Sequence, residues 1–127
     1  ARPSALPLVM AVHHPPVAIG DPSFDAIGLR DAAALLERLA PTPQLQAVLF
    51  GHVHQHWQGP LPGRPEVPVL GCPSTLCGFG PVQPCPLGRP DDPGGRWLEL
   101  NPAGGVHHTL LRWKAVAPAL SLASGSP

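Results

Sequence analysis

The sequence predicts an α/β fold, and three segments in its first half carry this prediction. Residues 6–12 and 45–50 are short, mostly apolar runs of the kind that forms buried strands. Residues 29–40 lie between them and are rich in Ala and Leu, with apolar side chains at helical spacing. A strand, a helix and a second strand in this order form a βαβ unit, which implies two parallel strands joined by a right-handed crossover.

The segments around the predicted helix indicate where it begins and ends. Asp25 lies a little upstream and is a candidate cap, and Pro41 cannot continue a helix. Residues 15–28 are rich in Pro, Gly and Asp, which favour turns, and we expect a loop there.

The second half of the sequence predicts antiparallel strands. Residues 67–70 form a short apolar run in which Pro68 is typical of an edge strand. Residues 96–100 and 106–113 flank a five-residue loop rich in Gly and Pro, a pattern that predicts a hairpin. The remainder of 59–95 is dense in Pro and Gly and is predicted to be mostly loop.

Two regions follow from these patterns. Residues 1–114 are predicted to form part of one folded domain, and residues 115–127 offer little to bury and are expected to be a disordered tail. The chain lacks an initiator Met and a basic leader, and its first predicted strand begins within a few residues of position 1. We therefore expect a C-terminal fragment of a longer protein.

The composition excludes several classes of partner. The chain has 8 basic and 8 acidic residues, a formal net charge of zero and no Lys/Arg cluster, which argues against nucleic acid and acidic membranes as partners. No apolar run approaches the length of a membrane-spanning helix. The 3 cysteines lack metal-site or disulfide spacing, which favours the cytoplasm. The oligomeric state stays open.

Histidines follow both apolar strands of the predicted βαβ unit. His13 and His14 come after the first strand, and His52 and His54 come after the second, behind Gly51. In open α/β sheets, ligands bind in the crevice at the carboxyl ends of the strands. Because neutral imidazole is a common metal ligand, the sequence predicts a metal-dependent enzyme site at this edge.

Four segments quoted from the sequence match motifs of one enzyme superfamily. His-His-Pro-Pro at 13–16 and Gly-His-Val-His at 51–54 resemble the C-terminal half of the calcineurin-like metallophosphoesterases. Residues 72–79 and 93–100 resemble the Pro-Ser-Thr segment and a later strand of its class III, Icc-type cyclic-AMP phosphodiesterases. The likeness covers residues 6–113 and implies half of a β-sandwich flanked by helices.

The resemblance implies a metal-dependent phosphodiester hydrolase that uses two divalent metal ions as cofactors. It assigns His13 and His52 to one ion and His54 to the other. Two such ions clamp a phosphate and bring the pKa of a bridging water close to neutrality. Mixed His and carboxylate ligation suits Mn, Fe or Zn.

The resemblance also implies how a substrate is held. It assigns a catalytic role at the substrate phosphate to His14, and substrate binding to Ser74 and Thr75. The leading substrate is cyclic AMP, a small cyclic nucleotide. Two other functions stay open: hydrolysis of another phosphodiester or a nucleotide pyrophosphate, and a non-catalytic metal-binding module.

The sequence departs from the family's pattern in two ways. The Asp-x-His, bridging Asp and Asn-His segments of the family are not present, so we expect the 127-residue chain alone to be inactive or nearly so. Gly78 and Gly95 stand where the family has a polar and an aromatic residue.

Other notable side chains are given simpler roles. His56 is predicted to be solvated, and Arg96 to lie on the surface at a strand end. His107 and His108 alternate along a strand and should face opposite sides of the hairpin. All tryptophans are interpreted as packing residues: Trp57, Trp97 and Trp113.

Overall fold

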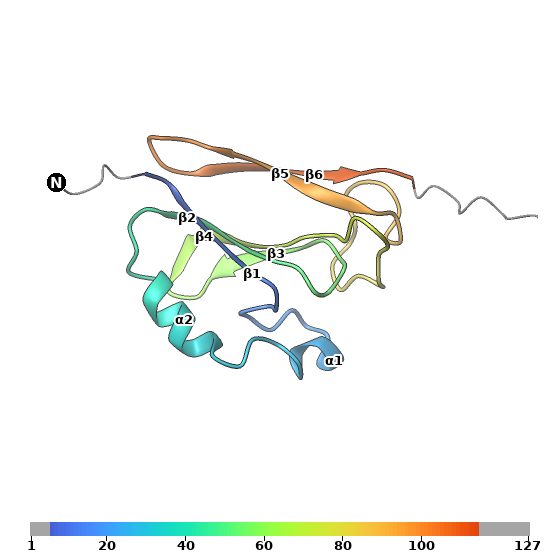
Figure 1. Cartoon of the computed structure of the whole chain (residues 1–127), viewed down its shortest axis with the longest axis horizontal. Coiled ribbons are helices and arrows are strands. Elements are labelled where there is room, and N and C mark those ends of the chain that lie inside the picture. The colour runs from blue at the N-terminus through green and yellow to red at the C-terminus, as the bar shows by residue number, and fades with distance from the viewer. Residues whose placement is uncertain (1–5, 115–127) are drawn as a thin grey trace, which may run out of the picture.

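The computed structural model describes residues 6–114 and shows a mixed α/β fold (Figure 1). The elements of this part of the chain are β1 (Leu8–Val12), α1 (Pro22–Asp25), α2 (Ala32–Leu39), β2 (Leu45–Phe50), β3 (Trp57–Leu61), β4 (Arg64–Gly71), β5 (Gly94–Leu100) and β6 (Val106–Arg112). The expected α/β class is confirmed, while the tail predicted at 115–127 lies outside the described residues.

A four-stranded sheet in the order β1-β2-β4-β3 forms the centre of the fold. Strands β1 and β2 are parallel and are joined through α2, which confirms the predicted βαβ unit. Strand β4 continues the parallel arrangement beside β2. The carboxyl ends of β1 and β2 therefore reach the same edge, where Val12 lies opposite Phe50.

The helices differ from the prediction in their ends. Asp25 does not cap α2; it lies in the short helix α1, inside the segment predicted to be loop. Its carboxylate instead accepts the amide protons of Ile19 at 2.7 Å and Gly20 at 3.1 Å. Helix α1 forms there because Asp21 caps it by accepting the amide protons of Ser23 and Phe24.

Strand β3 was not predicted, and its partner β4 is longer than the predicted 67–70. The proline-based prediction of an edge strand is also wrong, because β4 lies between β2 and β3. Pro68 is tolerated because β2 pairs with β4 only from Val69 onward. On the other side, Pro68 lies opposite Pro60, so neither residue leaves an amide donor unpaired.

The hydrophobic core lies between the central sheet and the helices. Phe50, Val48 and Val69 are almost fully buried there, and Leu35 and Phe24 pack against them from the helices. Figure 1 shows both helices on one side of the sheet and the β5–β6 hairpin on the other. The core thus holds β1 and β2 in place from the helical side.

The predicted hairpin is confirmed as an antiparallel pair of β5 and β6 with a turn over 101–105. It packs on the sheet through its inner face, where Leu110 is buried. Its outer face leaves Trp97 59% and Trp113 44% exposed, so the prediction that they are packing residues is wrong. Trp57 is buried as expected, and its indole N–H donates to the carbonyl of Ile19 at 2.9 Å.

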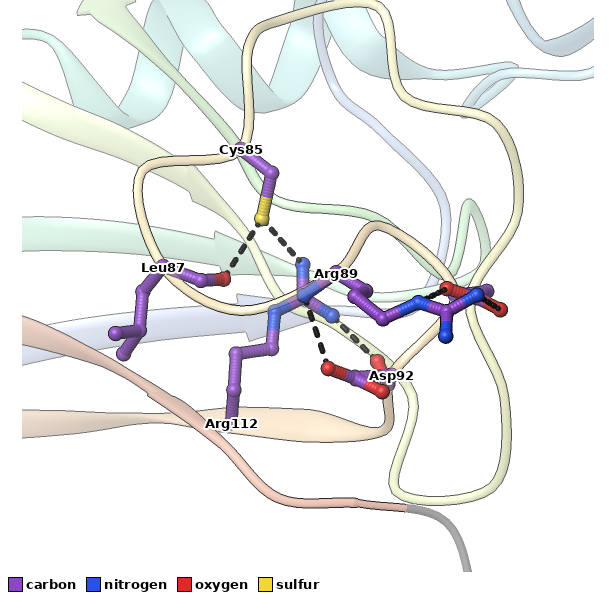
Figure 2. Close-up of polar contacts among 6 residues, drawn as sticks. Cys85, Leu87, Arg89, Asp92 and Arg112 are labelled. Atoms are coloured by element: carbon purple, nitrogen blue, oxygen red, sulfur yellow. Dashed lines mark hydrogen bonds and ion pairs between the residues drawn. The ribbon is translucent and has the colours of Figure 1, made fainter.

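The long loop between β4 and β5 is fixed to the hairpin by Arg112 (Figure 2). Its guanidinium donates to the Asp92 carbonyl at 2.6 Å and lies 3.4 Å from the Cys85 sulfur. The Asp92 carboxylate accepts the Arg89 amide proton at 2.9 Å. Although rich in Pro and Gly, this loop is held by side-chain contacts in its second half.

Two findings bear on the predicted environment of the chain. Within residues 6–114 no helix is long and apolar enough to cross a membrane. The thiols of Cys72, Cys77 and Cys85 are free.

Candidate metal centre

Three imidazoles meet where β1 and β2 end. One ring nitrogen of each of His13, His14 and His52 lies within 4.8 Å of the others. Nδ1 of His52 is 3.2 Å from Nε2 of His13, and the His14 and His52 ring centroids are 4.4 Å apart. We call these three residues the histidine group. It contains three of the four histidines that the sequence placed at this edge.

The backbone explains this convergence. The amide of Gly51 donates to the carbonyl of His13 at 3.1 Å, which ties the two strand ends together. His52 and His54 have φ of 64° and 50°, in the left-handed region that non-glycine residues rarely adopt. Val53 between them is fully buried. The turn therefore anchors one side chain in the core, and strained residues of this kind cluster at functional sites.

The surroundings of His52 favour its neutral form and leave one ring nitrogen unpaired. Burial lowers the pKa of His52, and the neighbouring His14, His13 and His54 lower it further. Its Nε2 atom is buried and has no hydrogen-bond partner. Neutral imidazole is the form that binds metals, so the surroundings of His52 favour the ligating state.

His54 is not a member of the histidine group. Its ring stacks on Phe79 with centroids 4.3 Å apart and planes 2° apart. Its Nδ1 atom is 3.9 Å from the sulfur of Cys77, and its carbonyl accepts the Phe79 amide proton at 3.1 Å. Sequence reasoning did not predict a role for Phe79 or Cys77 at this site, because their contacts with His54 span more than twenty positions.

The predicted substrate-binding residues lie in the loop after β4. The Ser74 hydroxyl oxygen accepts the amide proton of Leu76 at 3.0 Å, so its own proton is still free to donate. Thr75 is exposed. Their assignment to substrate stays a prediction.

A second set of histidines surrounds Arg96, between the sheet and the hairpin. The guanidinium lies 3.0 Å from Nδ1 of His56 and 3.2 Å from Nδ1 of His108, and it donates to the Gly71 carbonyl at 3.0 Å. We call this set the arginine cluster. His56 is only 6% exposed and Arg96 is half-buried, so the predictions of a solvated His56 and a surface Arg96 are wrong.

Protonation of the arginine cluster follows from its packing. Burial, and then the charge of Arg96, lowers the pKa of His56 to about 4. A neutral His56 can accept the guanidinium N–H through Nδ1. On the other face of the hairpin, His107 is exposed and lies 3.2 Å from Glu99, which confirms that His107 and His108 face opposite sides.

Comparisons with known proteins give a consistent result for the class of enzyme. No protein-family model matches the chain. It is 54% identical over 112 residues to a probable cyclic nucleotide phosphodiesterase of Synechococcus sp. strain WH7803, covering 88% of this chain and 42% of that protein. It is 41% identical over 114 residues to the 3′,5′-cyclic adenosine monophosphate phosphodiesterase of Pseudomonas aeruginosa, covering 83% of this chain and 38% of that protein.

A third relative extends the comparison. A probable cyclic nucleotide phosphodiesterase of Synechococcus sp. strain PCC 6301 is 41% identical over 99 residues, which cover 77% of this chain and 34% of that protein. The chain thus spans less than half the length of these relatives. All three carry names of phosphodiesterases that act on cyclic nucleotides.

Proposed function

We propose that this chain is part of a metal-dependent phosphodiesterase that hydrolyses cyclic nucleotides, with cyclic AMP as the leading substrate. The observation that carries the proposal is the histidine group at the carboxyl ends of two parallel strands. The names of the relatives support the same reaction.

The histidine group fits a metal ion by its chemistry. Its three side chains offer nitrogen ligands, which suit Mn, Fe or Zn better than Mg. The buried Nε2 atom of His52 has no protein partner, and a nitrogen that binds a ligand would be left unpaired in this way. In our proposal His13 and His52 hold one of two divalent ions, and His54 holds the other together with groups outside this chain. When bound, the ions activate water and offset charge on the phosphate.

The neighbouring side chains would bind and orient the substrate. His14 lies in the histidine group, and we assign it to the phosphate, where an imidazole N–H donates to a phosphate oxygen. The Ser74 hydroxyl, which has a free proton, and the exposed Thr75 hydroxyl are assigned to the same substrate.

The wider proposal concerns the whole enzyme. We propose that the central sheet and the β5–β6 hairpin are the C-terminal half of a β-sandwich of the metallophosphoesterase type, completed by residues outside this chain. We also propose a cytoplasmic location, consistent with the three free thiols.

The proposal is tested with the natural polypeptide that carries this sequence, at its full length. Metal content is measured by elemental analysis, and hydrolysis rates are measured for cyclic AMP, ADP-ribose and ribose 3′,5′-cyclic phosphate. We expect turnover of cyclic AMP that is abolished by a chelator and restored by Mn, Fe or Zn. The 127-residue chain alone is the comparison and should be inactive, because three imidazoles without a carboxylate hold at most a weak site.

The other outcomes separate the alternatives. Hydrolysis of ADP-ribose without hydrolysis of cyclic AMP would keep the metal-dependent reaction and reject the substrate. Stoichiometric metal without hydrolysis of any of the three compounds would indicate a non-catalytic metal-binding module. Full activity in the presence of the chelator would overturn the proposed chemistry.

A further inference from the structure

A row of aromatic rings leads away from the histidine group. The ring of Phe24 lies 6.0 Å from that of His52 and is nearly perpendicular to it, at 83°. Phe79 lies 6.2 Å from Phe24 at 22°, and its ring stacks directly on His54. Phe24 therefore lies next to both His52 and Phe79.

Phe79 is not explained as a packing residue. It is 44% exposed, whereas the aromatic residues of the core, Phe50 and Trp57, are buried. The ring is nevertheless held in place, because His54 covers one face and the Phe79 amide is bonded to the His54 carbonyl. A fixed and partly exposed aromatic ring beside a ligand site offers a ready stacking surface.

The distance between the rings of Phe79 and Phe24 indicates which part of the Phe79 ring a ligand can contact. A third ring inserted between Phe79 and Phe24 would need about 7 Å, twice the usual contact distance. The observed 6.2 Å is shorter than this, so a planar ligand has to lie against the solvent-exposed part of Phe79.

We propose that Phe79 stacks on the nucleobase of a cyclic nucleotide whose phosphate is held at the histidine group. The inference rests on the proposed function and adds a residue that distinguishes nucleotides from other phosphodiesters. Every base has a π face, and stacking is tolerant of base identity. Phe79 therefore favours nucleotides over base-free esters, with little preference between adenine and guanine.

The test uses the full-length protein and three variants. Phe79→Leu keeps an apolar side chain and removes the π face, and Phe79→Tyr keeps the π face. Leu76→Ala is the matched control, because Leu76 is 77% exposed on the same loop. Kinetics are measured on cyclic AMP and on ribose 3′,5′-cyclic phosphate, and calorimetry measures the binding of AMP and of ribose 5-phosphate.

Phe79→Leu should raise KM for cyclic AMP and weaken AMP binding by about 5- to 150-fold, the range expected for loss of one base–aromatic stack. The two base-free compounds should change by less than about twofold. Phe79→Tyr should restore wild-type values, and Leu76→Ala should match the wild type.

Two results would overturn the inference while leaving the proposed function intact. Equal losses on base-containing and base-free compounds would mean that Phe79 only supports His54. Unchanged KM for cyclic AMP and unchanged AMP binding in Phe79→Leu would mean that the base lies elsewhere. Failure of the wild-type protein to hydrolyse either cyclic ester would instead reject the proposed function, and the inference with it.

Discussion

Histidines converge at two places in this fold, and their neighbours differ. In the histidine group, His13, His14 and His52 face one another, and a buried ring nitrogen of His52 has no partner. In the arginine cluster, His56 and His108 each face a guanidinium N–H of Arg96. The first arrangement leaves a ring nitrogen without a partner, whereas in the second the Nδ1 atoms of both imidazoles are paired with Arg96, and the unpaired atom is Nε of the arginine itself.

The comparison shows that residue type and position near a strand end do not define a site. His52 and His56 are four residues apart in the same turn, yet one has its ring among other imidazoles and the other is packed under the hairpin. The difference comes from what lies opposite each ring. A buried polar group that the protein has already paired supports the fold, whereas an unpaired one needs another partner.

The largest expected effect comes from removing a ring from the histidine group. In the full-length protein, His52→Ala should lower metal content and reduce turnover of a phosphodiester by on the order of a thousandfold, because charge stabilisation in the transition state is lost. Elemental analysis and steady-state kinetics measure both effects.

The matched control is His107→Ala, which removes an exposed imidazole from the outer face of the hairpin. This variant should keep its metal and its activity, and its stability should change by less than about 1 kcal/mol. Wild-type turnover in His52→Ala, or equal losses in both variants, would show that the histidine group is not the metal site.

A smaller effect, on stability, is expected from the arginine cluster. Arg96→Met removes the donor that faces both imidazoles and the Gly71 carbonyl. Leaving buried acceptors without a donor should lower the free energy of unfolding by about 2–3 kcal/mol. The midpoint of urea unfolding measures this loss.

Arg89→Met is the control for that experiment, because the Arg89 side chain is exposed and pairs with the exposed Asp91. It should leave the urea midpoint almost unchanged. Equal midpoints for Arg96→Met and the wild type would mean that the hydrogen bonds of Arg96 contribute nothing measurable to stability.

The last expected effect is a pH dependence of stability that originates in His56. Its pKa is about 4 in the folded protein against 6.5 for an ordinary histidine, so the unfolded state binds more protons between these values. This contribution is fully present above pH 6.5 and is lost as the pH falls toward 4. Urea midpoints across this window, with a chelator present, should fall less steeply in His56→Gln. An identical slope in both proteins would contradict the assignment.

The fold could be predicted from the sequence where apolar residues recur with a clear period and where turn-forming residues mark the ends of strands. The βαβ unit follows from two apolar runs and an Ala/Leu helix, and the hairpin follows from its Gly/Pro turn. Strand β3 was missed because Gly59 and Pro60 disfavour strands in isolation. In the structure this segment is defined by pairing with β4, which is a tertiary effect.

The candidate site was predictable only in part. The histidines that follow two parallel strands correctly predicted that His13 and His52 lie close together, because parallel strands end at the same edge of the sheet. It did not anticipate that His54 stacks on Phe79 or that Arg96 covers His56. These contacts depend on how a long loop and a hairpin fold back on the sheet, and local sequence carries little information about that.

The left-handed backbone conformation of His52 and His54 affects which substitutions stabilise the protein. Glycine adopts this conformation without strain, so Gly at position 52 or 54 would relax the turn that these histidines strain. Variants selected only for resistance to heat should therefore tend to replace the imidazoles of this turn. Such a screen would enrich well-folded proteins that have lost imidazoles of the proposed metal site, so both positions should be kept unchanged when the protein is stabilised.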